Sequence, residues 1–161
     1  MELRIGHGYD LHRLEKAQND DQVLRVGGVP VNCGLAAVAH SDGDAVLHAV
    51  TDALLSAAGE PDIGQLFPDI NPENENRDSV EFLVEAVERI NKGGWAIGNV
   101  DITVVCDLPK IGPLREQICE NIRTYLVAPV NIKGKTHERT NTFGAIEVHV
   151  VALLQRGKKY E

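Results

Sequence analysis

Residues 41–59, SDGDAVLHAVTDALLSAAG, carry the clearest helical pattern in the chain, and the fold can be worked out from them. At about 100° per residue, one face is apolar and holds Val46, Val50, Ala53, Leu54 and Ala57. The opposite face is polar and holds Ser41, Asp44, His48 and Asp52. The pattern predicts a helix that is capped by Ser41 and ended by Gly59 and Pro61. Its N-terminus suits a phosphate group.

The segments around this helix alternate between strand-like and helix-like patterns. Strands are predicted at residues 2–9, 23–32, 95–107, 130–136 and 145–155, and further helices at residues 79–91 and 113–126. The order β-β-α-α-β-α-β-β predicts an α/β (α+β) fold, with a mixed sheet and helices packed on one face. A chain of 161 residues allows one domain of ordinary size, so we expect residues 1–161 to form a single domain.

Composition excludes several classes of function. The formal net charge of -8 would repel a polyanion over most of the surface, so nucleic acid is not expected as a partner. No run of 18 apolar residues exists, so no membrane span is expected either. The three cysteines form no C-x-x-C pair and are expected to be reduced thiols. We expect a soluble intracellular protein, unless a transit peptide has been removed.

A short strand segment offers the first candidate site. In GHGYDLHRL, residues 6–14, Asp10 and His12 are two positions apart, so their side chains share one face of a strand. If the polar face of the helix lies against this strand, His48 adds a second nitrogen ligand, and the three residues resemble an open, catalytic zinc site. The alternatives are a surface hydrogen bond for the pair and a solvated outer face for the helix.

The order of several motifs resembles one family. RIGHGYDLHRL, GGVPV, AHSDGDAVLHAVTDALLSAAG, PDIGQLFPD, IGNVDITVV, PKIGP and VNIKGKTHE occur in the order found in the 2-C-methyl-D-erythritol 2,4-cyclodiphosphate synthases, over nearly the full length. The resemblance implies a homotrimer with its strands towards the trimer core and with active sites between subunits. It implies a lyase that cyclises 4-diphosphocytidyl-2-C-methyl-D-erythritol 2-phosphate and releases CMP, in the non-mevalonate (MEP) pathway of isoprenoid (terpenoid precursor) biosynthesis. The location implied is the bacterial cytoplasm or the plastid stroma.

The resemblance also implies roles for particular residues. Asp10, His12 and His48 would bind zinc, and Glu138 of the adjacent subunit would hold magnesium or manganese at the diphosphate. His40 and Ser41 would contact phosphate. The ribose and methylerythritol groups would be bound by Asp62, Ile63, Gly64, Phe67 and Asp69. The cytidine pocket would be formed by Cys106, Pro109, Lys110, Ile111, Gly134, Lys135 and Thr136. Asp42, Asp44 and Asp52 are expected to orient ligands or solvate the helix rather than bind metal.

The C-terminal part departs from the family pattern. Only seven residues, RTNTFGA (139–145), separate Glu138 from Ile146, and the Arg-Gly-Glu stretch that lines the trimer channel in several members is absent. An isoprenoid diphosphate is therefore not predicted as a ligand. His137 stands where many members have Thr. Two alternatives remain open: a zinc-dependent hydrolase of a small phosphate ester, and an inactive trimeric protein that binds CDP or metal.

Overall fold

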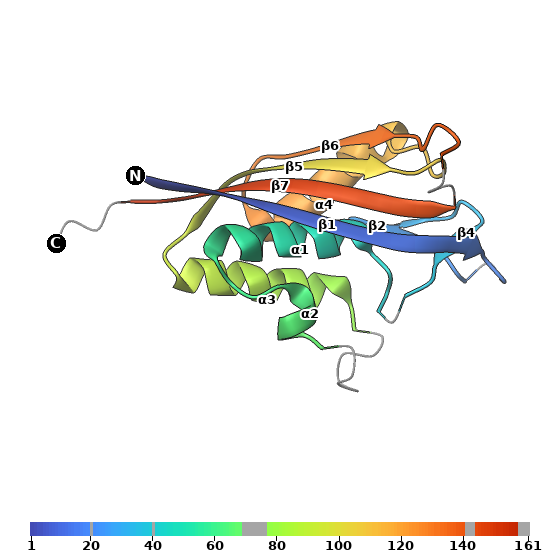
Figure 1. Ribbon diagram of the computed structural model, residues 1–161. Helices are drawn as coiled ribbons and strands as arrows, with labels where there is room; N and C mark the ends of the chain where they lie inside the picture. Colours follow the sequence, from blue (N-terminus) through green and yellow to red (C-terminus); the bar gives the residue numbers. More distant parts are fainter. Residues whose placement is uncertain (20, 40, 69–76, 141–143, 158–161) are drawn as a thin grey trace.

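The central element of the fold is a five-stranded mixed sheet (Figure 1). The computed structural model describes residues 1–157 except 20, 40, 69–76 and 141–143. The strands are β1 (Glu2–Lys16), β4 (Leu35–Ala37), β5 (Ala96–Val105), β6 (Val130–Lys135) and β7 (Ala145–Arg156), and their order is β4-β1-β7-β5-β6. Only β5 and β6 pair in parallel, and the other neighbours are antiparallel. The short strands β2 (Leu24–Val26) and β3 (Val29–Val31) form a separate hairpin.

Helices cover one face of the sheet. They are α1 (Ala45–Ala58), the short α2 (Ile63–Leu66), α3 (Ser79–Lys92) and α4 (Arg115–Leu126), with a 3₁₀ turn, η2 (Gly112–Leu114), before α4. Every second residue of β7 from Ile146 to Leu154 is fully buried, and the buried residues of α4 and most of those of α1 belong to the same apolar cluster. The period of two follows from the pleat, which sends alternate side chains to opposite faces. The mixed sheet with helices on one face is therefore confirmed.

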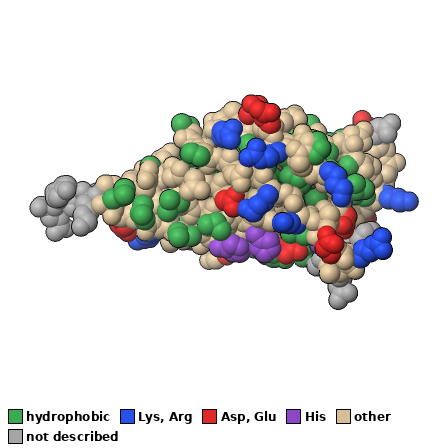
Figure 2. All heavy atoms as spheres, turned by 90° about the horizontal axis from the view of Figure 1, so that it is seen from above, with side chains coloured by type: hydrophobic (Ala, Val, Ile, Leu, Met, Phe, Trp, Pro, Cys, Tyr) green, Lys and Arg blue, Asp and Glu red, His purple; other side chains and the backbone are tan. Residues whose placement is uncertain are grey.

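The face of the sheet away from the helices remains exposed. Leu3, Ile5, Tyr9 and Leu11 on β1 and Val151 on β7 are each at least 44% exposed, and Ile5 is 73% exposed. Figure 2 shows hydrophobic side chains and neighbouring histidines when the molecule is seen from above the view of Figure 1. We call the residues Leu3, Ile5, Tyr9, Leu11 and Val151 the outer apolar face. Exposed apolar area of this extent is typical of an interaction surface.

Two glycines let α1 lie directly on β1. A Cβ atom on Gly6 would come within 2.0 Å of the Ala53 carbonyl oxygen, and one on Gly8 within 1.9 Å of the Ala49 carbonyl oxygen. Only residues without a side chain allow the helix backbone this close to the strand. This contact brings the middle of α1 beside the residues of β1 that follow Gly8.

Several boundaries differ from those that the sequence pattern predicts. β1 extends to Lys16 rather than ending at residue 9, because β4 pairs with residues 14–16. The predicted strand at 23–32 is instead the β2-β3 hairpin, which turns at two glycines with positive φ. Neither β4 nor α2 was predicted.

The cap of α1 also differs from the prediction. The N-cap is Asp44 and not Ser41, since the Asp44 side chain accepts a hydrogen bond from the Leu47 backbone N–H at 3.0 Å. Asp44 is fully buried and also accepts from the backbone N–H groups of Gly27 and Gly28 at 2.9 and 2.6 Å. The expectation that Asp44 solvates the helix is therefore wrong. The β2-β3 turn packs against this end of α1, and its backbone N–H groups need an acceptor.

Candidate functional site

Asp10, His12 and His48 come together at the contact between β1 and α1. Asp10 Oδ2 lies 3.2 Å from His12 Nε2 and 3.1 Å from His48 Nδ1. One ligand atom from each residue lies within 4.8 Å of those of the other two. Of the two alternatives that the sequence left open, the structure shows the one in which His48 lies against the D-x-H strand, and the solvated outer face is excluded for His48.

The environment of the three residues shifts their protonation in different directions. Burial lowers the pKa of His12, which favours the neutral imidazole that metals bind. Burial acts to lower the pKa of His48 as well, but the hydrogen bond to Asp10 and the charge of that carboxylate outweigh it and raise the pKa. Burial acts to raise the pKa of Asp10, and the hydrogen bond from His48 and the charge of His12 reverse this, so the pKa is lowered.

These residues fit a divalent metal. His12 Nε2 is buried and has no hydrogen-bond partner among the described residues, although Asp10 is close to it. A buried, unpaired ring nitrogen is costly unless something binds it. Two imidazole nitrogens and one carboxylate oxygen match the donor set of a catalytic zinc site with an open fourth position. The group can therefore hold a divalent metal ion.

The candidate phosphate contact lies beside this group. Ser41 Oγ is 3.3 Å from His48 Nε2 and also accepts a hydrogen bond from the Gly43 backbone N–H at 3.3 Å. Ser41 is therefore a neighbour of the metal group even though it does not cap α1. The other predicted phosphate contact, His40, lies outside the described residues.

The predicted sugar-binding segment is held by α1. Asp62 caps α2, and the Ile63 backbone N–H donates to Asp52 Oδ1 at 2.8 Å. Since Asp52 follows His48 by one helical turn, α2 is anchored next to the metal group. Phe67 is buried against Phe82 with ring centroids 4.7 Å apart, and the Phe82 ring lies 6.1 Å from that of His48.

A hollow opens beside this segment. It has a volume of about 500 Å³ and includes Asp52 and Asp62 together with residues of β1 and of the end of α1. The Asp62 carboxylate accepts from the side chain and the backbone of Gln65, which lowers its pKa and keeps it an acceptor. Gly64 lies within α2 and is exposed to solvent. Asp69, predicted for the same group, lies outside the described residues.

The predicted cytidine residues form a second group at the ends of β5 and β6. The Cys106 backbone N–H donates to the Lys135 carbonyl at 3.0 Å, and a Cβ atom on Gly134 would lie 2.9 Å from the Ile111 side chain. The Cys106 Sγ donates to the Pro109 carbonyl at 3.3 Å. Burial raises the pKa of the Cys106 thiol to about 11, so it is not a nucleophile at neutral pH. Lys110 and Lys135 are exposed, and Thr136 is half-buried.

Glu138 follows this second group and has an exposed carboxylate. The Thr136 hydroxyl donates to its Oε1 atom, and its backbone has a φ of 49°, which is rare for a residue with a side chain. Before it, His137 is buried, with Nδ1 3.2 Å from Asp107 Oδ2. This contact joins the ends of β5 and β6, and no pattern in the sequence predicts it. Of the shortened segment 139–145, residues 141–143 lie outside the described residues.

The two groups lie at one end of the sheet but not next to each other within one chain. Leu11 of β1 pairs with Glu147 of β7, Glu147 pairs with Val105 of β5, and Val105 pairs with Lys135 of β6. Three strand spacings therefore separate β1 from β6, which is roughly 14 Å at about 4.8 Å per spacing. The metal group and the predicted cytidine residues of one chain are therefore not in contact across the sheet.

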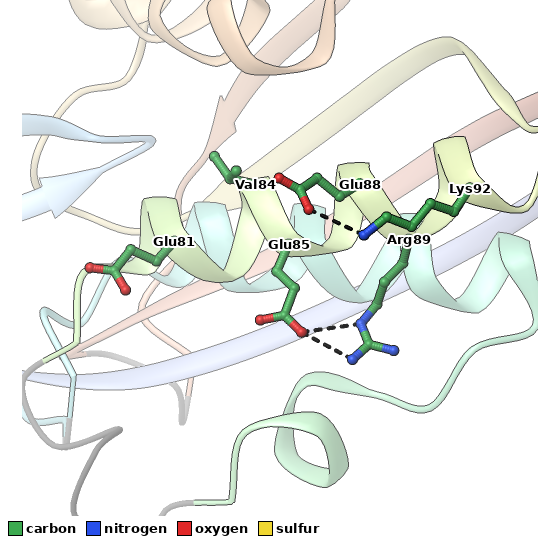
Figure 3. Close-up of a pocket in the computed structure, with 6 residues that line it drawn as sticks. All are labelled: Glu81, Val84, Glu85, Glu88, Arg89 and Lys92. Atoms are coloured by element: carbon green, nitrogen blue, oxygen red, sulfur yellow. Dashed lines mark hydrogen bonds and ion pairs between the residues drawn. The ribbon is translucent and has the colours of Figure 1, made fainter.

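A further hollow, of about 610 Å³, lies along α3 (Figure 3). All of its lining residues come from this one helix: Glu81, Val84, Glu85, Glu88, Arg89 and Lys92. Its charged groups pair with each other, Glu85 with Arg89 at 3.0 Å and Glu88 with Lys92 at 3.4 Å. None of the predicted site residues borders it, so it is an ordinary charged helix surface. In the described part of the chain, no helix is long and apolar enough to cross a membrane.

Comparisons with known proteins agree with the motif order. The chain is 43% identical to the protein named 2-C-methyl-D-erythritol 2,4-cyclodiphosphate synthase, chloroplastic, of Oryza sativa subsp. japonica, over 97% of this chain and 71% of that protein. It is 45% identical to the synthase of the same name from Gemmatimonas aurantiaca, over 90% of this chain and 87% of that protein.

Solved structures show the same fold. The CDP complex of IspF from Plasmodium falciparum is 38% identical and superposes with a TM-score of 0.84 over 97% of both chains. The model of the YgbB family matches residues 3–155, which is nearly the whole chain. On this coverage and identity, the chain belongs to the YgbB family.

Proposed function

We propose that this chain catalyses the cyclisation of 4-diphosphocytidyl-2-C-methyl-D-erythritol 2-phosphate to 2-C-methyl-D-erythritol 2,4-cyclodiphosphate in isoprenoid biosynthesis. An oxygen of the 2-phosphate attacks the β-phosphorus, the bond from that phosphorus to the oxygen bridging to the α-phosphate breaks, and CMP leaves with both electrons of that bond. The chain is thus an enzyme of the lyase class. Relatives named for this activity, 42–45% identical over most of their length, support the assignment.

The convergence of Asp10, His12 and His48 carries the proposal, because it brings together the donor set of a catalytic metal site. These three residues would hold zinc, which when bound polarises a phosphate oxygen and stabilises negative charge. No nucleophile from the protein is needed, since the attacking group belongs to the substrate. The chain's own residues therefore act by positioning the two phosphates and by neutralising charge.

Other residues would orient the two ends of the substrate. Ser41 would donate to a phosphate beside the metal group, together with His40. Asp62 and the backbone of Gly64 would bind the ribose hydroxyls, while Ile63, Phe67 and Asp69 would line the methylerythritol part. A lowered pKa keeps Asp62 ionised as an acceptor for hydroxyl groups. The hollow of about 500 Å³ beside it offers room for a sugar.

The cytidine end would be bound by a second copy of the chain. Its pocket would be formed by Cys106, Pro109, Lys110, Ile111, Gly134, Lys135 and Thr136, with Glu138 holding magnesium or manganese at the diphosphate. A single carboxylate and the substrate phosphates are a common way to bind magnesium. The roughly 14 Å between the two groups in one chain supports a site completed by a neighbour. The outer apolar face supports a homotrimer in which the strands face the centre.

The relatives include chloroplastic plant proteins and bacterial proteins. We place this enzyme accordingly in the bacterial cytoplasm or the plastid stroma.

Complementation between two inactive variants tests the shared site. His48→Ala and Glu138→Ala are each expected to abolish CMP release when assayed alone with zinc and magnesium. After the two are mixed, unfolded and refolded together, some sites combine an intact metal group with an intact cytidine group, and CMP release returns in part. If the mixture stays as inactive as its components, the two groups do not come from different chains.

A further inference from the structure

The His48 ring contacts Ser79, a residue of another helix, on the side away from Asp10. Ser79 Oγ lies 2.8 Å from His48 Nε2, although the two residues are 31 positions apart in sequence. Ser79 is the first residue of α3 and has no exposed surface. The opposite ring nitrogen, Nδ1, faces Asp10 at 3.1 Å. One edge of the imidazole therefore points to the metal group and the other to Ser79.

The Asp42 carboxylate accepts two hydrogen bonds from Ser79. The Ser79 hydroxyl donates to Asp42 Oδ1, and the Ser79 backbone N–H donates to Asp42 Oδ2 at 3.2 Å. Asp42 also accepts from the Asp44 backbone N–H at 3.2 Å, and Arg25 Nε lies 3.9 Å from it. Asp42 is thus an acceptor fixed by two backbone donors and one nearby positive charge.

The direction of these bonds follows from the chemistry of the groups. An ionised carboxylate can only accept, so the single hydrogen of the Ser79 hydroxyl points to Asp42. Ser79 Oγ is then left to accept, and its partner His48 Nε2 must carry a hydrogen. The lone pair of Nδ1 is then available to a metal ion, and Nδ1 is the nitrogen that faces Asp10.

Two features distinguish Ser79 from its competitor Ser41. Ser41 Oγ is 3.3 Å from the same nitrogen, 0.5 Å farther than Ser79 Oγ, and within the described ranges of the chain it has no carboxylate partner. Phe82, one turn along α3 from Ser79, packs near the His48 ring at 6.1 Å between centroids. Two residues of the first turn of α3 therefore contact the His48 ring: Ser79 at Nε2 and Phe82 beside the ring. The Ser41 hydroxyl remains available to bind a ligand.

We propose that Ser79, oriented by Asp42, is a positioning residue that fixes the orientation and tautomer of His48 for metal binding. The inference rests on the metal site proposed above. Metal-binding histidines usually donate their second ring N–H to a carboxylate, a carbonyl or water, and such partners typically change metal affinity by about 10–100-fold. Here the Ser79 hydroxyl lies between the Asp42 carboxylate and the His48 ring and hydrogen-bonds to both. This hydroxyl also links α3 to α1 at the site.

Ser79→Ala tests the proposal cleanly, because it removes the hydroxyl but keeps the backbone N–H bond to Asp42. Zinc affinity is measured by competition with a chromophoric chelator, and the ligand geometry by the visible absorption of the cobalt-substituted protein. We expect zinc affinity to fall about 10–100-fold and the cobalt bands to shift. The matched control is Asp78→Ala, which removes the α3 cap, a 2.9 Å bond from the Val80 N–H, without touching His48. It should keep the wild-type affinity and spectrum.

A wild-type zinc affinity and cobalt spectrum for Ser79→Ala would overturn the proposal, and so would an equal loss in Asp78→Ala. If Ser79→Ala does not fold, nitrogen NMR of the zinc-loaded wild-type protein decides. A hydrogen on His48 Nε2 and zinc on Nδ1 are expected, whereas the reverse arrangement contradicts the proposal. Both readouts are independent of turnover, so failure of the cyclase activity with normal zinc binding would count against the proposed function alone.

Discussion

Gly8 and Ala49 are in such close contact that a Cβ atom on the glycine would come within 1.9 Å of the Ala49 carbonyl oxygen. His48 precedes Ala49, and Asp10 follows Gly8 by two residues on the same face of β1. The absence of a side chain at Gly8 therefore sets the separation between the helix and the strand that carry the metal group.

Gly8→Ala is expected to lower stability and weaken metal binding together. The new methyl group meets the backbone of α1, which cannot rotate away as a flexible side chain would, so the helix must move outward. Overpacking of this kind costs about 1–3 kcal/mol and at times more. Thermal unfolding and zinc titration measure the two effects. Gly112→Ala is the control, because apart from its chain neighbours no described residue has a heavy atom within 4 Å of a Cβ there, and it should change neither quantity.

His48→Ala should remove tightly bound zinc and abolish CMP release while the fold persists. The variant leaves two of the three metal ligands, Asp10 and His12. Metal analysis after dialysis and circular dichroism test this. For zinc content alone, His7→Ala is the matched control, because this exposed histidine lies on the opposite face of β1 from Asp10 and His12. Full zinc occupancy in His48→Ala would remove the basis of the metal assignment.

In the metal-free protein, the Asp10 and His48 pair should stabilise the fold most in mildly acidic solution. His48 has a raised pKa, so its contribution is complete below the unfolded value of 6.5 and is lost as pH rises through the folded pKa. Asp10 has a lowered pKa, so its contribution is present above 3.8 and is lost as pH falls through the folded pKa.

Denaturant unfolding of metal-free wild type and Asp10→Asn at several pH values measures this contribution. The difference in unfolding free energy should be largest near about pH 5 and smaller at about pH 9. A difference that grows steadily with pH would show that the pair is not coupled as the structure indicates.

Ile5→Lys is expected to break the association of subunits and with it the activity. The side chain lies on the outer apolar face and is 73% exposed in a single chain, so burying a lysine there in an oligomer leaves an unpaired charge. Sedimentation analysis would show monomers. Val127→Lys adds the same charge at a site that is 90% exposed after α4 and should leave the assembly intact. An unchanged oligomer in Ile5→Lys would place the interface elsewhere.

Local patterns predicted the parts of the fold that depend on local physics. The α1 and α3 helices follow from apolar spacing, and the pairing of Asp10 with His12 follows from the period of a strand. The true cap of α1, Asp44, was missed because its other donors come from Gly27 and Gly28, which only the folded chain brings near. A sequence pattern contains no information on such distant partners.

The same limit applies to the site. The metal group was predictable, since two of its ligands share a strand and the third shares the polar side of a helix. Ser79 was not, because nothing in the sequence around it separates a buried partner of His48 from an ordinary first residue of a helix. The link between His137 and Asp107 depends likewise on the parallel pairing of β5 and β6.

Phosphorus NMR of the purified protein with 4-diphosphocytidyl-2-C-methyl-D-erythritol 2-phosphate, zinc and magnesium tests the central claim most directly. The account predicts resonances of a cyclic diphosphate and of CMP in equal amounts, no orthophosphate, and loss of both products when EDTA is added. Orthophosphate in place of the cyclic product would identify a hydrolase. Binding of CDP without any turnover would identify an inactive binding protein, and either result would contradict the cyclase assignment.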